Sequence, residues 1–120
     1  MTISQFQHIQ VSMVKDVAVV EIVAKDLRGP DSALELGGEL RAVAAQEWAK
    51  RLLINFRHVR YLSSTGFAVL VKLLNEAKDK SQQVKFCEMD RDVRVGADII
   101  GLARYVEIHD TESAALKAFV

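Results

Sequence analysis

The sequence predicts an α/β fold with a mixed, mostly parallel sheet of about four to five strands and four helices packed on it. Two runs rich in Val and Ile open the chain with the pattern of a strand hairpin. Three further short apolar runs alternate with stretches of helical periodicity, giving the order ββαβαβαβα. Parallel neighbours need crossover helices, so this order favours helices packed on a mixed sheet. We expect a single domain over residues 1–120, because no linker, repeat or low-complexity tract divides the sequence.

The first half is expected to contain two strands, a loop and a helix. These elements are predicted at Gln7–Met13, Asp16–Ala24, 25–31 and about Ser32–Trp48. The two strands are joined by a tight turn around Lys15 and Asp16, and the loop carries the only proline of the sequence. Asp31 or Ser32 is the expected N-cap of the helix, because short polar side chains satisfy the free amides of a first turn.

The second half is expected to contain three strands and three helices. The strands are predicted at Arg51–Phe56, Val84–Cys87 and Tyr105–Ile108. The helices are predicted through Phe67–Ala77, from Asp90 to about Leu102, and at Thr111–Phe119. The first of these strands is almost continuously apolar, which is typical of a central strand covered on both faces. Thr111 is the expected cap of the last helix. Glu88, Asp90 and Asp92 are expected to cap the helix before it, with a cation site as the alternative.

Composition and charge exclude several functions. Sixteen basic residues balance sixteen acidic ones, which is unlike the basic surface of a nucleic-acid binder. No run approaches the roughly 18 apolar residues that span a bilayer, and the N-terminus lacks the pattern of a secretion signal, so we expect a cytoplasmic protein with no direct membrane insertion. The single cysteine, Cys87, cannot form an internal disulfide and is interpreted as a small buried apolar residue.

No arrangement of residues indicates an enzyme, a metal site or a cofactor. His8, His58 and His109 fall on three different predicted elements, so they do not share the spacing of a metal site. His58 lies six residues before Ser64, but the sequence supplies no carboxylate to orient it as a catalytic base. No glycine-rich phosphate loop follows a strand. We therefore expect a protein that acts by binding.

The turn Ser63–Gly66 is the strongest candidate functional segment. It follows the most buried predicted strand and opens a helix, where α/β proteins often place functional groups. Ser63 suits the N-cap, which places Ser64 and Thr65 in the first turn; ordinary capping is the alternative explanation for this cluster. A phosphate on Ser64 would lie beside free backbone amides. The basic residues expected within its reach are Arg57, His58 or Arg60.

This turn lies in a stretch, Leu53–Leu70, that resembles the STAS family of anti-sigma factor antagonists and their relatives. The family commonly shows an apolar strand, a short loop, and Asp-Ser-Ser-Gly or a close variant before a helix. On that pattern Ser64 takes the place of the phosphorylated serine, and Gly66 that of the glycine. Ser63 replaces the aspartate that is frequent in the family. The segment Asp92–Leu116 resembles the family's closing helix, strand and helix.

The resemblance implies a STAS fold and a bacterial regulatory protein that an ATP-using partner serine kinase phosphorylates on Ser64. It also implies that the unphosphorylated protein binds an anti-sigma factor or other serine protein kinase, which releases a sigma factor from its inhibitor. The implied partner-binding residues are Ser63, Thr65, Gly66, Phe67, Asp26 and Asp31. The protein itself is expected to need no cofactor, to catalyse no reaction and to be a monomer or weak dimer.

Two other functions stay open on the sequence. One is a STAS subunit of a membrane transport ATPase or a signalling scaffold, which would use the same helix end without a phosphorylation switch. The other is an enzyme or receiver-like phosphoacceptor. A receiver needs an aspartate at the end of its central strand, whereas Arg57 and His58 follow Phe56 here.

Overall fold

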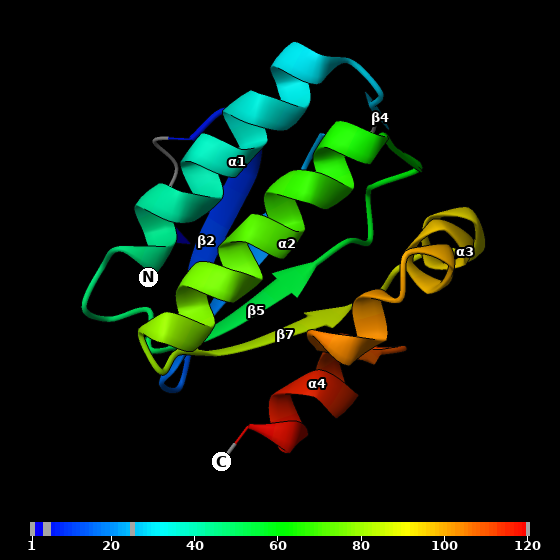
Figure 1. Ribbon diagram of the computed structural model, residues 1–120. Helices are drawn as coiled ribbons and strands as arrows, with labels where there is room; N and C mark the ends of the chain where they lie inside the picture. Colours follow the sequence, from blue (N-terminus) through cyan, green and yellow to red (C-terminus); the bar gives the residue numbers. More distant parts are fainter. Residues whose placement is uncertain (1, 4–5, 25, 120) are drawn as a thin grey trace.

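The computed structural model describes residues 2–3, 6–24 and 26–119 (Figure 1). The strands are β1 Thr2–Ile3, β2 Ile9–Val14, β3 Val17–Ile22, β4 Asp26–Leu27, β5 Arg51–Asn55, β6 Tyr61–Leu62, β7 Gln83–Cys87 and β8 Glu107–His109. The helices are α1 Pro30–Ala44, α2 Ser64–Asp79, α3 Arg91–Ile99 and α4 Glu112–Ala118, with a short 3₁₀ helix at Leu102–Arg104.

The main sheet has the strand order β1-β2-β3-β5-β7-β8. β1 and β2, and β2 and β3, pair antiparallel, whereas β3, β5, β7 and β8 run parallel. The predicted mixed, mostly parallel sheet is therefore confirmed, and the two-residue β1 is an addition to the five predicted strands. The hairpin also turns where predicted, because Val14 pairs with Val17 and Lys15 takes the positive φ of 56° that the tight turn requires.

The helices cover the two faces of the sheet unequally. α1 and α2 lie side by side across one face (Figure 1), over a large core in which the Phe56 and Phe86 rings lie 5.0 Å apart. A second, smaller core lies on the other face, where Val19 and Leu53 of the sheet pack with Ala115 of α4. Since side chains alternate along a strand, this division follows directly from the apolar runs of β3 and β5. The face on which the short helix α4 packs is therefore covered by fewer helical residues than the face on which α1 and α2 pack.

The start of α1 differs from the prediction. Its N-cap is Gly29, which supplies no side-chain cap, and Pro30 opens the helix, so the expected capping by Asp31 or Ser32 is wrong. Proline suits the first helical position because its fixed φ matches the helix and it has no amide hydrogen to satisfy there. The Ser32 hydroxyl instead donates to the Gly29 carbonyl at 3.0 Å. The helix ends at Ala44, earlier than the predicted Trp48. The residues that follow, up to Ala49, form hydrogen-bonded turns.

The C-terminal third follows the predicted order with adjusted bounds. Asp90 caps α3 by accepting a hydrogen bond from the Val93 amide at 2.9 Å, and Thr111 caps α4 through the Ala114 amide at 3.1 Å, as predicted. The capping of α3 expected from Glu88 is wrong, because the Glu88 carboxylate accepts from the Glu112 amide of α4 at 2.9 Å. α3 ends at Ile99, short of the predicted Leu102, because Gly101 has a positive φ of 72° and breaks the helix. The strand after it is β8, which begins two residues later and ends one residue later than the predicted Tyr105–Ile108.

A two-stranded sheet of β4 and β6, absent from the prediction, forms beside the start of α2. The pair is parallel, and Asp26 lies opposite Tyr61 in its register. The Ser63 amide continues the contact by donating to the Leu27 carbonyl at 3.3 Å. This small sheet therefore anchors the loop that leads into α2.

Candidate functional site

The turn that opens α2 is held by a hydrogen-bonded cap. The Ser63 hydroxyl accepts from the Gly66 amide at 3.1 Å, and the Ser63 carbonyl accepts from the Phe67 amide at 3.0 Å. The predicted N-cap is thus confirmed. Because Ser63 supplies the cap, the hydroxyl of the next residue, Ser64, is not needed to start the helix.

The four residues after the cap differ in exposure. Ser64 is exposed, and its side chain makes no hydrogen bond with any described residue. Thr65 is half-buried, Gly66 is buried, and Phe67 keeps only 8% of its surface exposed. Ser64 is therefore the hydroxyl of this turn that an approaching protein can reach most easily.

Gly66 permits a close approach that another residue would block. A Cβ at this position would lie 2.3 Å from Cδ1 and 2.9 Å from Cγ of Leu62, closer than real Cβ contacts. Leu62 could not keep its present place beside a larger residue. The glycine of the turn thus allows β6 to pack against the first turn of α2, which explains the residue type physically.

An apolar groove of about 540 Å³ opens beside Ser64, between α2 and α3. Its apolar side chains are those of Leu62, Phe67, Ala68, Val71, Ile99 and Ile100. Ile99 is 79% exposed and Ile100 40% exposed, which is unusual for adjacent large aliphatic residues. Ser64 itself lines the groove. An exposed hydroxyl and an exposed apolar surface therefore share one site.

The two walls of this groove approach closely because Gly96 of α3 faces Phe67. A Cβ on Gly96 would lie 3.0 Å from two ring carbons of Phe67. The ring is thereby held between the helices while part of it still lines the groove. Phe67 thus serves as a buried wall of the groove, with little surface of its own exposed.

The basic residues predicted to reach a phosphate each face a carboxylate. Arg57 lies 3.9 Å from Glu112, His58 3.0 Å from Glu21, and Arg60 3.9 Å from Asp90. These are part-exposed pairs, which contribute little to stability and can exchange partners at low cost. Any contact between them and a phosphate on Ser64 would compete with these carboxylates.

Asp26 and Asp31 occupy different places relative to the site. The backbone of Asp26 pairs with Tyr61 in the small sheet, directly before the α2 turn, and its side chain lies outside the described part of the structure. Asp31 is exposed in the first turn of α1. No hydrogen bond or ion pair of the described residues joins it to the Ser63 turn. Of the two, Asp26 is the one whose backbone pairs with the segment that leads into α2.

Several site residues were missed by the sequence analysis. Tyr61 is 51% exposed and lies under the Arg28 guanidinium, whose carbon is 4.7 Å from the ring centroid. Ile99 and Ile100 were assigned only to a helix. Two adjacent isoleucines at a helix end, followed by a glycine, leave no position for both in a core, and this pattern was the available signal.

The remaining reactive groups form no metal-binding arrangement within the described ranges. His58 does have a carboxylate partner, Glu21, which the sequence did not indicate. No group of three or more His, Cys, Asp or Glu among these residues could hold a metal ion. Cys87 is fully buried, as predicted. Burial raises the pKa of its thiol to about 12, and the carboxylates of Glu112 and Glu88 add to the rise. The thiol therefore stays protonated and unreactive at neutral pH.

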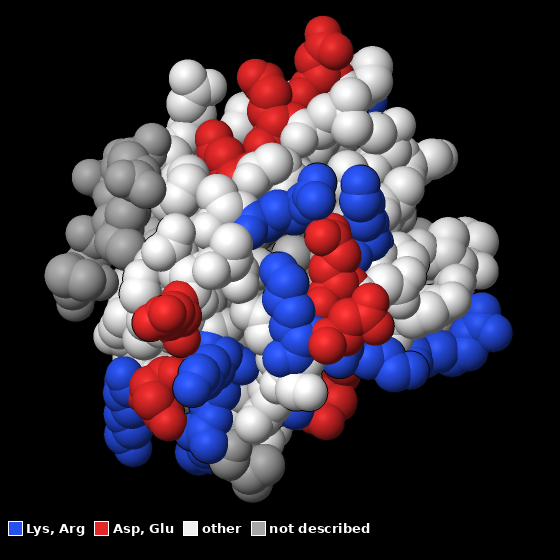
Figure 2. All heavy atoms as spheres, turned by 60° about the vertical axis from the view of Figure 1, so that its left-hand side comes forward, with Lys and Arg blue, Asp and Glu red and all other residues white. Residues whose placement is uncertain are grey.

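The face of the molecule in Figure 2 agrees with the balanced composition. On the face that Figure 2 shows, acidic and basic side chains alternate in small groups. This distribution is unlike the continuous basic surface that binds a phosphate backbone. In the part of the chain that the structure describes, none of the helices has the length and apolar character needed to cross a membrane.

Comparisons with solved structures show the same fold in several proteins. An anti-sigma factor antagonist from Mycobacterium paratuberculosis is similar with a TM-score of 0.82 and 22% identity, over 92% of this chain and 91% of that one. The phosphorylated Bacillus cell fate determinant SpoIIAA gives 0.67 and 14%, over 91% and 96%. A sulfate transporter family protein from Wolinella succinogenes gives 0.72 and 14%, over 88% and 86%. A search of curated protein sequences found no match.

The sequence also matches a family model. The model is that of the STAS domain, and the match covers residues 18–115, from the second residue of β3 through β8, with the Ser63 turn and both walls of the groove. The resemblance drawn from Leu53–Leu70 and Asp92–Leu116 is confirmed by this match and by the shared fold. The chain belongs to the STAS domain family.

Proposed function

We propose that the protein is an anti-sigma factor antagonist-like regulator that binds a partner serine kinase or anti-sigma factor and is switched off by phosphorylation at Ser64. The observation that carries the proposal is the place of Ser64, an exposed hydroxyl in the first turn of α2 that lines an apolar groove. The structural likeness to a solved anti-sigma factor antagonist supports it, as does the Bacillus relative whose structure is of a phosphorylated form.

The proposed switch does not require the fold to change. Ser63 caps α2, so a phosphate on Ser64 leaves the cap intact. The phosphate would lie at the positive end of the α2 dipole, where anions are favoured. The modified protein should therefore be at least as stable as the unmodified one. The phosphate therefore reduces the favourable free energy of binding to the partner without lowering the stability of the fold.

In the complex, the partner would cover the groove beside Ser64. Its apolar side chains would pack on the exposed Ile99 and Ile100, while the rim around Ser63, Thr65 and Gly66 would meet polar groups. A phosphate there adds nearly two negative charges and bound water to a surface that must be desolvated. A loss of about 2–3 kcal/mol lowers the affinity roughly thirty- to a hundredfold or more.

The proposal assigns the chemistry to the partner. The kinase binds ATP and transfers the phosphate, and this chain supplies only the acceptor hydroxyl of Ser64 and the docking surface. In this scheme the protein works in the cytoplasm as one domain, is a monomer or weak dimer, and catalyses no reaction. Asp26 and Asp31 are proposed as polar contacts at the edge of the same surface.

The transporter or scaffold function remains as the second candidate. Its specific support is the similarity to the Wolinella sulfate transporter family protein, which at 14% identity extends to the fold alone. In that function the same groove would bind a large complex whether or not Ser64 carries phosphate. The two candidates therefore differ in how binding responds to charge at Ser64.

The experiment compares Ser64→Ala and Ser64→Asp as paired baits in the native cytoplasm, with mass spectrometry of bound proteins and phosphosite mapping of the unmodified protein. Enrichment of an ATP-binding serine kinase only on the Ala form, with phosphate mapped to Ser64, supports the proposal. Recovery of the same transporter or scaffold by both baits, with no phosphate on Ser64, contradicts it.

A matched control separates a local effect from a general effect of charge. Ser113 is exposed and lies in the first turn of α4, so Ser113→Asp adds the same charge to another helix start. It lines no part of the groove between α2 and α3. The Ser113→Asp bait should recover the same proteins as the unmodified chain, and none of the three variants should unfold at a lower denaturant concentration than the unmodified chain.

A further inference from the structure

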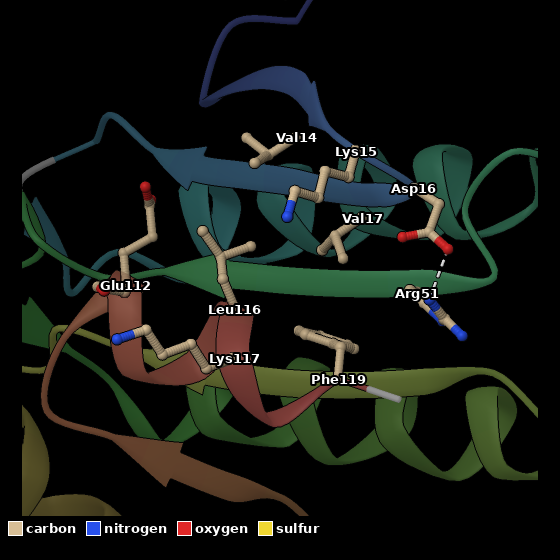
Figure 3. A pocket seen from close by; sticks show the side chains of 10 residues that line it. Val14, Lys15, Asp16, Val17, Arg51, Glu112, Leu116, Lys117 and Phe119 are labelled. Carbon is tan, nitrogen blue, oxygen red and sulfur yellow. Dashed lines mark hydrogen bonds and ion pairs between the residues drawn. The ribbon is translucent and has the colours of Figure 1, made fainter.

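A second groove lies on the opposite face of the sheet, where α4 gives the lighter cover (Figure 3). It has a volume of about 590 Å³, within the usual range of small-molecule sites. The tip of the β2–β3 hairpin forms one side and α4 with Phe119 forms the other. It shares no lining residue with the groove beside Ser64, so its occupant is independent of the proposed function.

The floor of this groove is apolar. Val14, which is 38% exposed, and Val17 line it from the hairpin, and Leu116 and Phe119 line it from the C-terminal segment (Figure 3). Phe119 is held in place by Lys85, whose Nζ lies 5.3 Å from the ring centroid. The groove follows α4, whose seven residues extend over about 10 Å. An extended alkyl chain of about this length can lie along the helix, because lining residues come from both ends of α4.

The charges around the groove leave two lysines without partners. Asp16 pairs with Arg51, and Glu112 accepts a hydrogen bond from the Asn55 side chain at 2.9 Å. Lys15 and Lys117, in contrast, make no ion pair or hydrogen bond with any described residue. Lys15 extends over the groove from the hairpin and Lys117 belongs to α4 on the other side (Figure 3). The unmatched charge at this groove is thus positive.

We propose that this groove binds a free fatty-acid-type carboxylate of medium chain length. The alkyl chain lies on Val17, Leu116 and Phe119, and the carboxylate binds Lys15 and Lys117. An apolar chain gains free energy by leaving water, and an anion gains from two unpaired ammonium groups at the rim. A cationic or neutral amphiphile would leave these lysines unmatched. The single aromatic ring and the lack of buried polar lining groups argue against a nucleotide.

The probe is decanoate, added below its micelle concentration to the full chain and followed by methyl and amide NMR shifts. Acetate tests the contribution of the charge without the tail, and decyltrimethylammonium tests the tail with the opposite charge. We expect saturable shifts at Val14, Val17 and Leu116 with decanoate, and much weaker shifts with the other two probes. Shifts confined to the groove between α2 and α3, or equal responses to all three probes, would overturn the proposal.

The lysines are tested by the double variant Lys15→Gln/Lys117→Gln. Since each exposed ion pair contributes modestly, we expect about tenfold weaker binding of decanoate with no change in unfolding midpoint. Lys72→Gln/Arg91→Gln removes the same charge from exposed residues that do not line this groove and should bind as the unmodified chain does. Equal affinity in both double variants overturns the proposal. Binding to anionic lipid vesicles without a response to decanoate would do so too, in favour of a membrane surface.

Discussion

Replacing Ser63 and Ser64 by alanine, one at a time, should affect stability differently. The Ser63 hydroxyl accepts from the amide of Gly66, a buried residue, at 3.1 Å. Loss of an N-cap costs about 1 kcal/mol, and a buried amide without a partner moves the cost toward 2 kcal/mol. Ser64 is exposed and its hydroxyl bonds to no described residue, and alanine is the better helix former by about 0.5 kcal/mol.

We therefore expect Ser63→Ala to lower the free energy of unfolding by about 1–2 kcal/mol, and Ser64→Ala to leave it unchanged or slightly higher. The assay is urea unfolding followed by circular dichroism, with the same slope required for each variant. Thr111→Ala removes a second side-chain cap, at α4, and serves as a reference of similar kind. Equal stability of the two serine variants, or a larger loss in Ser64→Ala, would refute the assignment of the cap to Ser63 and of the free hydroxyl to Ser64.

Three further predictions follow from the packing. Phe86→Ala should lower the free energy of unfolding by about 3–5 kcal/mol, because the ring is fully buried against Phe56; a loss below about 1 kcal/mol in urea unfolding would contradict this. Gly66→Ala should destabilise the protein, because contact with Leu62 costs about 1–3 kcal/mol and outweighs the roughly 1 kcal/mol gain in helix propensity; a stabilised variant in the same assay would disagree. Cys87, with its thiol pKa raised to about 12, should not react with a thiol reagent at pH 8 until urea unfolds the protein, and rapid reaction of the folded chain would contradict its burial.

The parts of the fold that the sequence predicted are those in which local pattern and burial agree. The almost continuously apolar run at Arg51–Phe56 indicated a central strand, and β5 lies between β3 and β7. Ser63, Asp90 and Thr111 were recognisable as caps because a short polar side chain precedes each helix. The Ser63 turn was recognisable as a candidate site because its polar side chains also precede a helix.

The parts that the sequence did not predict depend on contacts between distant segments. The pairing of β4 with β6 joins residues 26–27 to 61–62, and two-residue strands leave no periodic signal. The groove beside Ser64 exists because Gly96 lets α3 approach Phe67, and this closeness is a matter of tertiary packing. At α1, the prediction chose Asp31 or Ser32 as the side-chain cap and did not use Pro30, although proline is itself a signal of a first helical turn.

The most direct test of the account is the affinity of the partner recovered by the Ser64→Ala bait for the chain with and without phosphoserine at Ser64. Isothermal titration of the two forms, with phosphoserine at Ser113 as the control, measures the effect of the switch alone. The account predicts at least about thirtyfold weaker binding when Ser64 is phosphorylated, and no change for Ser113. Affinities for the two Ser64 forms that agree within about threefold would contradict it.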